Sequence, residues 1–247
     1  MSKILEPAKE LAVTGNYDTV VVGGGFGGVA AALAAARGGN KVLLCERMFV
    51  LGGLGTAGLV TIYLPLCDGR GHQVSFGIAE ELLKVSIQDG YEDRYPKPWL
   101  EDGTIEERAA QRYLVRYNAA ACAIAYEKLL LDNGVELLYG TVVEDGVITH
   151  LIVENKSGRS AIACGNVIDC SGDADVARFA GEDTAQYGRG NILAAWYYHT
   201  DEEGNKLQML GFADVPNPKG RPGEKEAMVN RKRYIGLEAD EITDFVI

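Results

Sequence analysis

The chain has 247 residues, of which 47% are hydrophobic, and its 35 acidic and 24 basic side chains give a formal net charge of −11. This length allows one or two domains, and the hydrophobic fraction is well above that of disordered chains. The acidic balance excludes the basic stripe with which proteins bind nucleic acid, and it disfavours an anionic membrane surface. We therefore expect a folded protein with no nucleic-acid partner.

The sequence contains neither a membrane span nor a metal-binding pattern. Its longest apolar runs, such as residues 59–66, are far shorter than the roughly 20 residues that cross a bilayer, and residues 1–12 lack a secretory signal. We expect a cytoplasmic protein. Five cysteines are widely spaced, with no Cys-x-x-Cys pair and no histidine at ligand spacing, so we expect reduced thiols and no metal: Cys45, Cys67, Cys122, Cys164 and Cys170.

The N-terminal third predicts a strand, a helix and a second strand. A lead-in of residues 1–16 ends at a turn signal, Thr14-Gly15-Asn16, and a β-branched run at 19–22 predicts a buried parallel strand. Residues 27–37 predict a helix that has no polar face and should be buried nearly all round. The second strand is predicted at 41–46.

The middle of the chain mixes loops and helices. The glycine-rich stretch 52–77 predicts loops near a ligand, and 78–86 predicts a short helix. Residues 88–105 carry glycine, proline and many charges, which is typical of an exposed excursion or a mobile cap. A longer helix is predicted at 118–131, ending at Asn-Gly.

The last part predicts strands and then a second domain. Runs at 135–139, 147–154 and 160–168 predict a strand and a β-meander inserted before a last buried strand at 166–169. Beyond these, 192–200 and 208–212 read as strands and 215–226 as a loop. The predicted fold class is α/β: a Rossmann-like domain at 1–187, with a parallel sheet, helices on both faces and a β-meander, followed by part of a substrate or cap domain at 188–247.

The strongest motif is the run Gly23-Gly24-Gly25-Phe26-Gly27-Gly28, which fits Gly-x-Gly-x-x-Gly. In that pattern Gly23 allows the tight turn, Gly25 lets the backbone approach a pyrophosphate, and Gly28 permits close packing of helix and strand. Main-chain amides at the helix N-terminus then hold the anionic diphosphate.

The context of the glycines favours dinucleotide binding over an ordinary turn. A β-branched strand precedes them, a small-residue helix follows, and Glu46 ends the next strand, where an acid accepts hydrogen bonds from an adenosine ribose. Taken singly, Glu46 also fits a solvated strand end. The fingerprint alone leaves both FAD and NAD open.

The chain resembles the FAD-dependent oxidoreductases of the glutathione-reductase-like superfamily over residues 4–185. The resemblance is carried by these segments: Glu6-Pro7 to Asp18, Val20 to Arg37, Glu46-Arg47, Leu51-Gly52-Gly53, Thr56-Ala57-Gly58 and Val167 to Asp175. It implies FAD as the cofactor. An extended FAD needs protein contacts on both sides of its diphosphate. The two glycine-rich segments that would flank one diphosphate also favour FAD over NAD.

The resemblance implies roles for individual positions. Gly53, Leu54 and Thr56 bring backbone and a hydroxyl against the pyrophosphate and ribityl chain, and the backbone of Val143 pairs with the adenine edge. The segment Ser171-Gly172-Asp173 turns beneath the diphosphate; by itself it also fits a helix N-cap, as Gly52-Gly53 fits an ordinary loop. The predicted cofactor residues are Gly23, Gly25, Phe26, Gly27, Gly28, Glu46, Arg47, Gly53, Leu54, Thr56, Val143, Ser171, Gly172 and Asp173.

The predicted activity is hydride transfer between a small organic substrate and the flavin N5, with a separate electron acceptor. No catalytic residue is assigned. His72 and His199 suit a general base, and Arg70, Arg112 and Arg116 suit a carboxylate clamp. A surface or core role is favoured for each histidine, and a solvated surface role for each arginine.

The chain is shorter than the family pattern. Two alternatives therefore stand beside the enzyme: a non-catalytic or incomplete FAD-binding fragment, and an NAD-binding dehydrogenase. The partners expected are the substrate, the acceptor, and a further copy or a second polypeptide that completes the fold.

Overall fold

The computed structural model describes residues 4–5, 7–92, 95–147, 149–185, 194–201, 204–212 and 234–246. The chain divides into two compact units, residues 1–183 and 184–247. Unit 1 contains every predicted cofactor residue. The loop predicted at 215–226, the boundary predicted at 187/188 and the start of the strand predicted at 192 lie outside the described residues.

Unit 1 is built on a six-stranded sheet in the order β5-β2-β1-β8-β7-β6. Its parallel part consists of β1 (Val13–Val22), β2 (Val42–Glu46), β5 (Glu136–Tyr139) and the long β8 (Gly158–Asp169). The antiparallel part consists of β6 (Val142–Val147) and β7 (His150–Asn155), which continue from β8 as a meander. This mixed, mainly parallel sheet confirms the predicted Rossmann-like α/β class.

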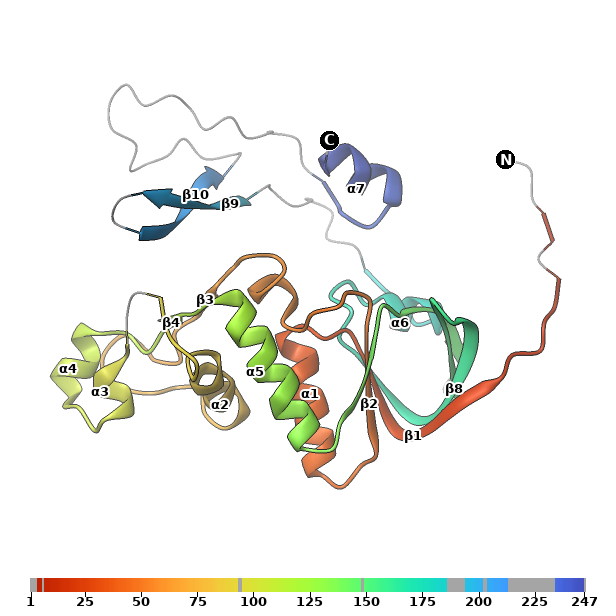
Figure 1. Cartoon of the computed structure of the whole chain (residues 1–247), viewed down its shortest axis with the longest axis horizontal. Helices are drawn as coiled ribbons and strands as arrows, with labels where there is room; N and C mark the ends of the chain where they lie inside the picture. The colour runs from red at the N-terminus through yellow and green to blue at the C-terminus, as the bar shows by residue number, and fades with distance from the viewer. Residues whose placement is uncertain are drawn as a thin grey trace. The chain divides into compact units, whose positions relative to one another are not determined.

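Alternate residues of the buried strands supply two hydrophobic cores, one on each face of the sheet. On one face, Val21 and Leu44 pack with helices α1 (Phe26–Arg37) and α5 (Ala119–Asp132). On the other, Val20 and Cys45 pack with the meander and with the short helix α6 (Asp175–Phe179). Figure 1 shows α1 and α5 side by side on the first face, with α6 and β8 beyond β1.

The predicted helices are found at nearly their predicted bounds. α2 spans Ile78–Ser86, and α5 begins after Asn118, whose side chain accepts a hydrogen bond from the Ala121 N–H. The expectation that the first helix is buried nearly all round is wrong, because only Gly28, Val29, Ala32 and Leu33 are fully buried.

Two predictions about turns and strands are also wrong. The turn predicted at 14–16 lies inside β1, because those residues pair with β8 across an irregularity between Val13 and Gly15. The single strand predicted at 147–154 is part of two strands, β6 and β7. Most of the described residues of 88–105 are exposed, as predicted. The stretch is anchored by Trp99 of α3 (Lys97–Leu100), which is buried and whose ring stacks on Tyr113.

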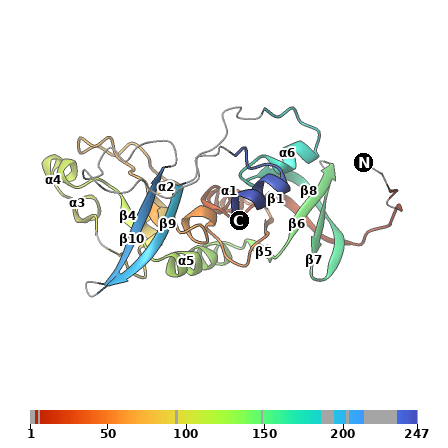
Figure 2. The ribbon, with the colours of Figure 1, turned by 90° about the horizontal axis from the view of Figure 1, so that it is seen from above.

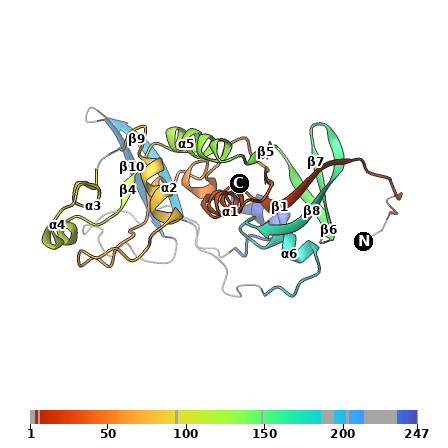
Figure 3. The same cartoon turned by 90° about the horizontal axis from the view of Figure 1, so that it is seen from below.

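The remaining elements of unit 1 are short. They are the 3₁₀ turn η1 (Gly53–Gly55), the strand pair β3 (Ile62–Tyr63) and β4 (Val115–Arg116), and helix α4 (Ile105–Ala110). In Figure 2 and Figure 3, α3 and α4 lie at one end of unit 1 and the β6–β7 meander lies at the other.

The described residues of unit 2 form an antiparallel hairpin and a helix. The hairpin pairs β9 (Ala194–Asp201) with β10 (Gly204–Phe212), near the strands predicted for a second domain, and α7 spans Ala239–Val246. Across the described parts of both units, no helix has the length and apolarity to cross a bilayer.

Candidate functional site

The turn from β1 into α1 requires glycine at two of its positions. Gly23 has a positive φ of 98°, and a Cβ atom there would lie 2.3 Å from the carbonyl oxygen of Cys170. A Cβ atom on Gly28 would lie 1.8 Å from the carbonyl oxygen of Gly23. These contacts bring the first helix against the turn and against the end of β8, as the glycine pattern predicts.

Two further glycines of the turn, Gly25 and Gly27, face open space. A Cβ atom on either one would meet no atom within 4 Å. Gly25 is the N-cap of α1, no described side chain caps this helix, and its first turn holds no acidic residue. Because the first amides of a helix point outward and carry partial positive charge, this end of α1 is suited to a bound anion.

A second glycine-rich turn lies directly beside the first. The Gly52 N–H donates a 2.8 Å hydrogen bond to the carbonyl of Gly24, and a Cβ atom on Gly53 would lie 3.2 Å from the Cα of Gly25. Leu54 is 77% exposed next to this junction. Thr56 is buried, and its hydroxyl donates to the carbonyl of Leu51, so it stabilises the turn from within.

Glu46 connects the end of β2 to the first turn. Its carboxylate is buried and accepts hydrogen bonds from the N–H of Gly24 at 2.6 Å and of Met48 at 2.7 Å. Each carboxylate oxygen has a second lone pair, so a ribose hydroxyl has an acceptor left. The neighbouring Arg47 is exposed.

The segment that contains Val143 is held next to Glu46, because the Thr141 N–H donates to the carbonyl of Glu46 at 3.1 Å. The Val143 side chain is buried in the second core. Its strand, β6, is the last of the sheet order, so one side of its backbone has no strand partner within the described sheet.

The end of β8 forms a third turn, which is organised by an aspartate. Asp169 pairs with Val22 across the sheet, and its carboxylate accepts from the N–H and hydroxyl of Ser171 and from the Ala177 N–H. Burial by itself raises the pKa of Asp169, but these donors outweigh it and lower the pKa below the ordinary value. Sequence reasoning missed this residue, although it lies in the segment that carries the resemblance.

The third turn leaves its tip open. Gly172 has a positive φ of 102° with no atom near its would-be Cβ, and Asp173 is exposed. The Ser171 hydroxyl accepts a hydrogen bond from the Asp175 N–H at the start of α6. The N-cap residue of this helix is Ala174, so the alternative prediction of an N-cap at Ser171 or Asp173 is wrong.

His72, one of the two histidines considered as a general base, is not placed at the glycine turns. Its Nδ1 lies 3.2 Å from Asp68 Oδ2, and its loop packs on α4, where a Cβ atom on Gly71 would lie 2.4 Å from the Ile105 carbonyl oxygen. Figure 1 shows α4 and α1 separated by α2 and α5. The Arg112 guanidinium lies beside Gly69 of the same loop. Arg116 belongs to β4, where its backbone pairs with Ile62 of β3. Residue 199 belongs to β9 in unit 2.

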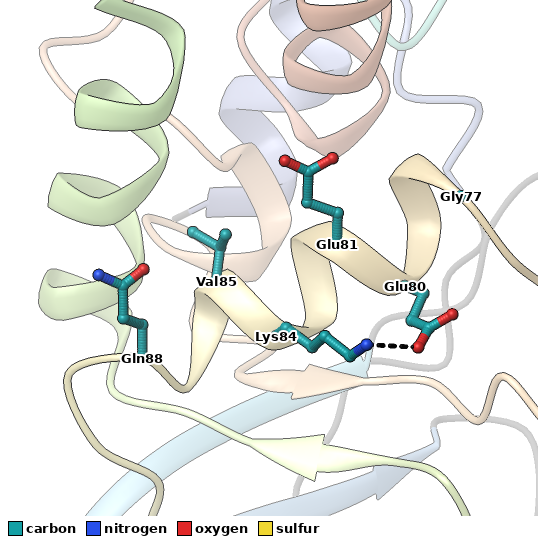
Figure 4. A pocket seen from close by; sticks show the side chains of 6 residues that line it. All are labelled: Gly77, Glu80, Glu81, Lys84, Val85 and Gln88. Atoms are coloured by element: carbon teal, nitrogen blue, oxygen red, sulfur yellow. Dashed lines mark ion pairs between the residues drawn. The ribbon is translucent and has the colours of Figure 1, made fainter. Parts of the chain in front are cut away.

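A surface pocket lies elsewhere, along α2. Figure 4 shows six residues that line it, with Glu80 and Lys84 joined as an ion pair of 2.6 Å. None of the six belongs to a glycine turn. Within the described ranges, no three His, Cys, Asp or Glu side chains come together as a metal site, and the five cysteines are unpaired.

Comparison with known proteins identifies the family. A family model described as FAD dependent oxidoreductase matches residues 18–196, and a search of curated proteins gives no match. Among solved structures, Thermovibrio ammonificans THI4 is 21% identical, with a TM-score of 0.45 over 68% of this chain and 64% of that one. L-proline dehydrogenase from P. horikoshii is 16% identical, with a TM-score of 0.47 over 78% and 63%.

The chain therefore spans less than two thirds of the length of these two proteins. The family match covers most of the chain, and it decides between the two dinucleotides that the fingerprint left open, so FAD is the cofactor. The chain belongs to the FAD dependent oxidoreductase family.

Proposed function

We propose that this chain binds FAD across its three turns and moves hydride between a small organic substrate and the flavin N5, with a separate acceptor that re-oxidises the flavin. The observation that carries the proposal is the start of α1. The first amides of this helix have no side-chain cap, and there is open space at Gly25 and Gly27. On either side of this space, at Gly23 and at Gly28, a side chain would collide with the backbone.

The diphosphate lies, in this proposal, against the amides of Phe26, Gly27 and Gly28. The close contact between Gly53 and Gly25 brings the second turn to the same place, so Gly53 and the exposed Leu54 extend the site toward the ribityl chain. The buried Thr56 supports this turn from within. The exposed Gly172 and Asp173 approach from the end of β8. Fixed main-chain donors suit an anion because they need little rearrangement on binding.

The adenosine lies on the other side of the diphosphate. Glu46 accepts from the ribose, and its two backbone hydrogen bonds orient the carboxylate before the ligand arrives. The backbone of Val143, on the edge strand next to Glu46, meets the adenine, with Arg47 beside it. When bound, FAD supplies the redox chemistry, while this chain supplies orientation and electrostatics.

The first test identifies the ligand. Protein purified without added cofactor is denatured, and the released small molecule is identified by mass spectrometry; we expect FAD. The intact protein should show a flavin absorption spectrum that bleaches with dithionite. Release of a nicotinamide dinucleotide, or of no nucleotide after loading with FAD, would refute the proposed site.

The second test concerns turnover. The flavin-loaded protein is mixed with small acids, amines and alcohols in the presence of an artificial dye acceptor, and dye reduction is followed. Reduction with one class of substrate supports the enzyme. A protein that holds FAD but reduces no dye supports the second candidate, a binding module without turnover, which is favoured by the position of His72 next to α4 rather than at the turns.

A further inference from the structure

Four aromatic rings from separate segments meet beneath the first two glycine turns; we call Phe26, Tyr63, Tyr117 and Tyr126 the aromatic brace. The ring of Phe26 stacks on Tyr63 with centroids 5.5 Å apart and an interplanar angle of 24°. It also meets Tyr126 edge-on at 5.2 Å and Tyr117 at 6.2 Å. Phe26 is the first residue of α1, so the side chain of a motif residue is turned into the protein while its amide stays at the turn.

The tyrosines of the brace are held in fixed orientations. The hydroxyl of Tyr63 donates to the carbonyl of Ala79 at 2.8 Å, and that of Tyr126 donates to the carbonyl of Leu82 at 3.0 Å. Tyr117 and Tyr126 are fully buried. Burial raises the pKa of Tyr63 and of Tyr126, so both hydroxyls stay neutral donors and the rings remain tied to α2.

The brace also fixes the second turn. A Cβ atom on Gly55, the last residue of η1, would lie 2.6 Å from Cζ of Phe26 and 2.6 Å from the hydroxyl oxygen of Tyr117. The backbone of η1 therefore rests directly on these two rings. Together with the hydrogen bond from Gly52 to Gly24, this contact sets the distance between the first and second turns.

We infer that Phe26 is a positioning residue for FAD: through the aromatic brace, its ring holds the two glycine turns at the spacing that one diphosphate requires. The inference rests on the proposed function, because it assumes that both turns contact FAD. Its physical basis is preorganisation, since a turn that is free to move must be ordered again when the ligand binds.

The test compares Phe26→Leu with Trp99→Leu in the full chain. Trp99 is the matched control because it belongs to the same hydrophobic core. Its substitution also removes one stacked ring pair, with Tyr113 at a centroid distance of 5.1 Å. It lies on α3, away from the turns (Figure 1). For each variant, the FAD dissociation constant is measured by fluorescence titration of the apoprotein, and the unfolding midpoint is measured separately.

Both variants should lower the unfolding midpoint. Phe26→Leu should weaken FAD binding about tenfold, whereas Trp99→Leu should change it less than about twofold. Equal changes in the two dissociation constants, or unaltered affinity in Phe26→Leu, would show that the ring is only a core contact. If Phe26→Leu does not fold, Tyr63→Leu removes the stacked partner instead, and Tyr63→Phe should restore the affinity because it keeps the ring.

The wild-type titration separates the two proposals. Wild-type protein that does not bind FAD overturns the proposed function. Wild-type protein that binds FAD while Phe26→Leu and Tyr63→Leu bind it equally well overturns the positioning role alone.

Discussion

The carboxylate of Glu46 lies 2.6 Å from the main-chain nitrogen of Gly24, while its other oxygen lies 2.7 Å from that of Met48. One buried acid thus ties the end of β2 to the glycine turn. A ribose-binding acid is expected at this position, but the structure shows that Glu46 also has a role in the fold itself.

Glu46→Gln should therefore destabilise the apoprotein, independently of any effect on FAD. The amide group of glutamine has one acceptor oxygen for two N–H donors, so one buried donor loses its partner, at a cost of about 1–3 kcal/mol. Urea unfolding of the apoprotein measures the change. Glu136→Gln is the control, since Glu136 is exposed and its hydrogen bond to Tyr17 should contribute less than about 1 kcal/mol. Equal unfolding free energies for Glu46→Gln and wild type would contradict this role.

Gly25→Val and Gly28→Ala should separate ligand binding from folding. Gly25 has a φ of −65° and open space at its Cβ position, so valine should change the unfolding free energy by less than about 1 kcal/mol while abolishing flavin absorbance. Gly28→Ala drives a methyl group into the Gly23 carbonyl and should cost about 3 kcal/mol or more. Thermal unfolding and the flavin spectrum of both variants check this. Retained flavin in a folded Gly25→Val protein would count against the site.

Asp169 should make stability depend on acid pH. Its pKa is lower in the folded protein than the ordinary aspartate value of about 3.9, so its stabilising effect is complete above that value and is lost as the pH falls through the folded pKa. The difference in unfolding free energy between wild type and Asp169→Asn should be largest near neutral pH and shrink below about pH 4. A difference that stays constant from pH 7 to about pH 3 would be inconsistent with this role.

The cysteines should react unequally with alkylating reagents. Burial raises the pKa of Cys45 and of Cys122 to about 12, so neither forms appreciable thiolate at pH 8. In the native protein, iodoacetamide should label both far more slowly than the half-buried Cys67, as followed by peptide mass spectrometry. After denaturation all five should react. Rapid native labelling of Cys45 would mean that β2 is not buried.

The sequence by itself determined the features that depend on neighbouring residues. The strand ending at Val22, the turn at Gly23 and the helix from Phe26 follow from β-branched, glycine and alanine signals close together in the chain, and all are present. The bounds of α2 were predicted for the same reason, as were those of α5 to within one residue at each end. The positive φ at Gly23 and the contact of Gly28 with the Gly23 carbonyl arise within the turn itself, so residue type alone reports them.

Only the tertiary structure decided the features that depend on distant partners. Residues 14–16 form strand rather than turn because β8, nearly 150 residues later, offers them backbone hydrogen bonds. The loop of His72 rests on α4 because Gly71 packs against Ile105, a contact that no local signal reports. Likewise, the role of Asp169 in the third turn depends on its hydrogen bonds to Ser171 and Ala177. The role of Phe26 in the aromatic brace depends on its stacking with Tyr63, which the sequence does not show. The energies of strand pairing and of side-chain packing depend on contacts between segments that are distant in the sequence. These contacts exist only in the folded structure.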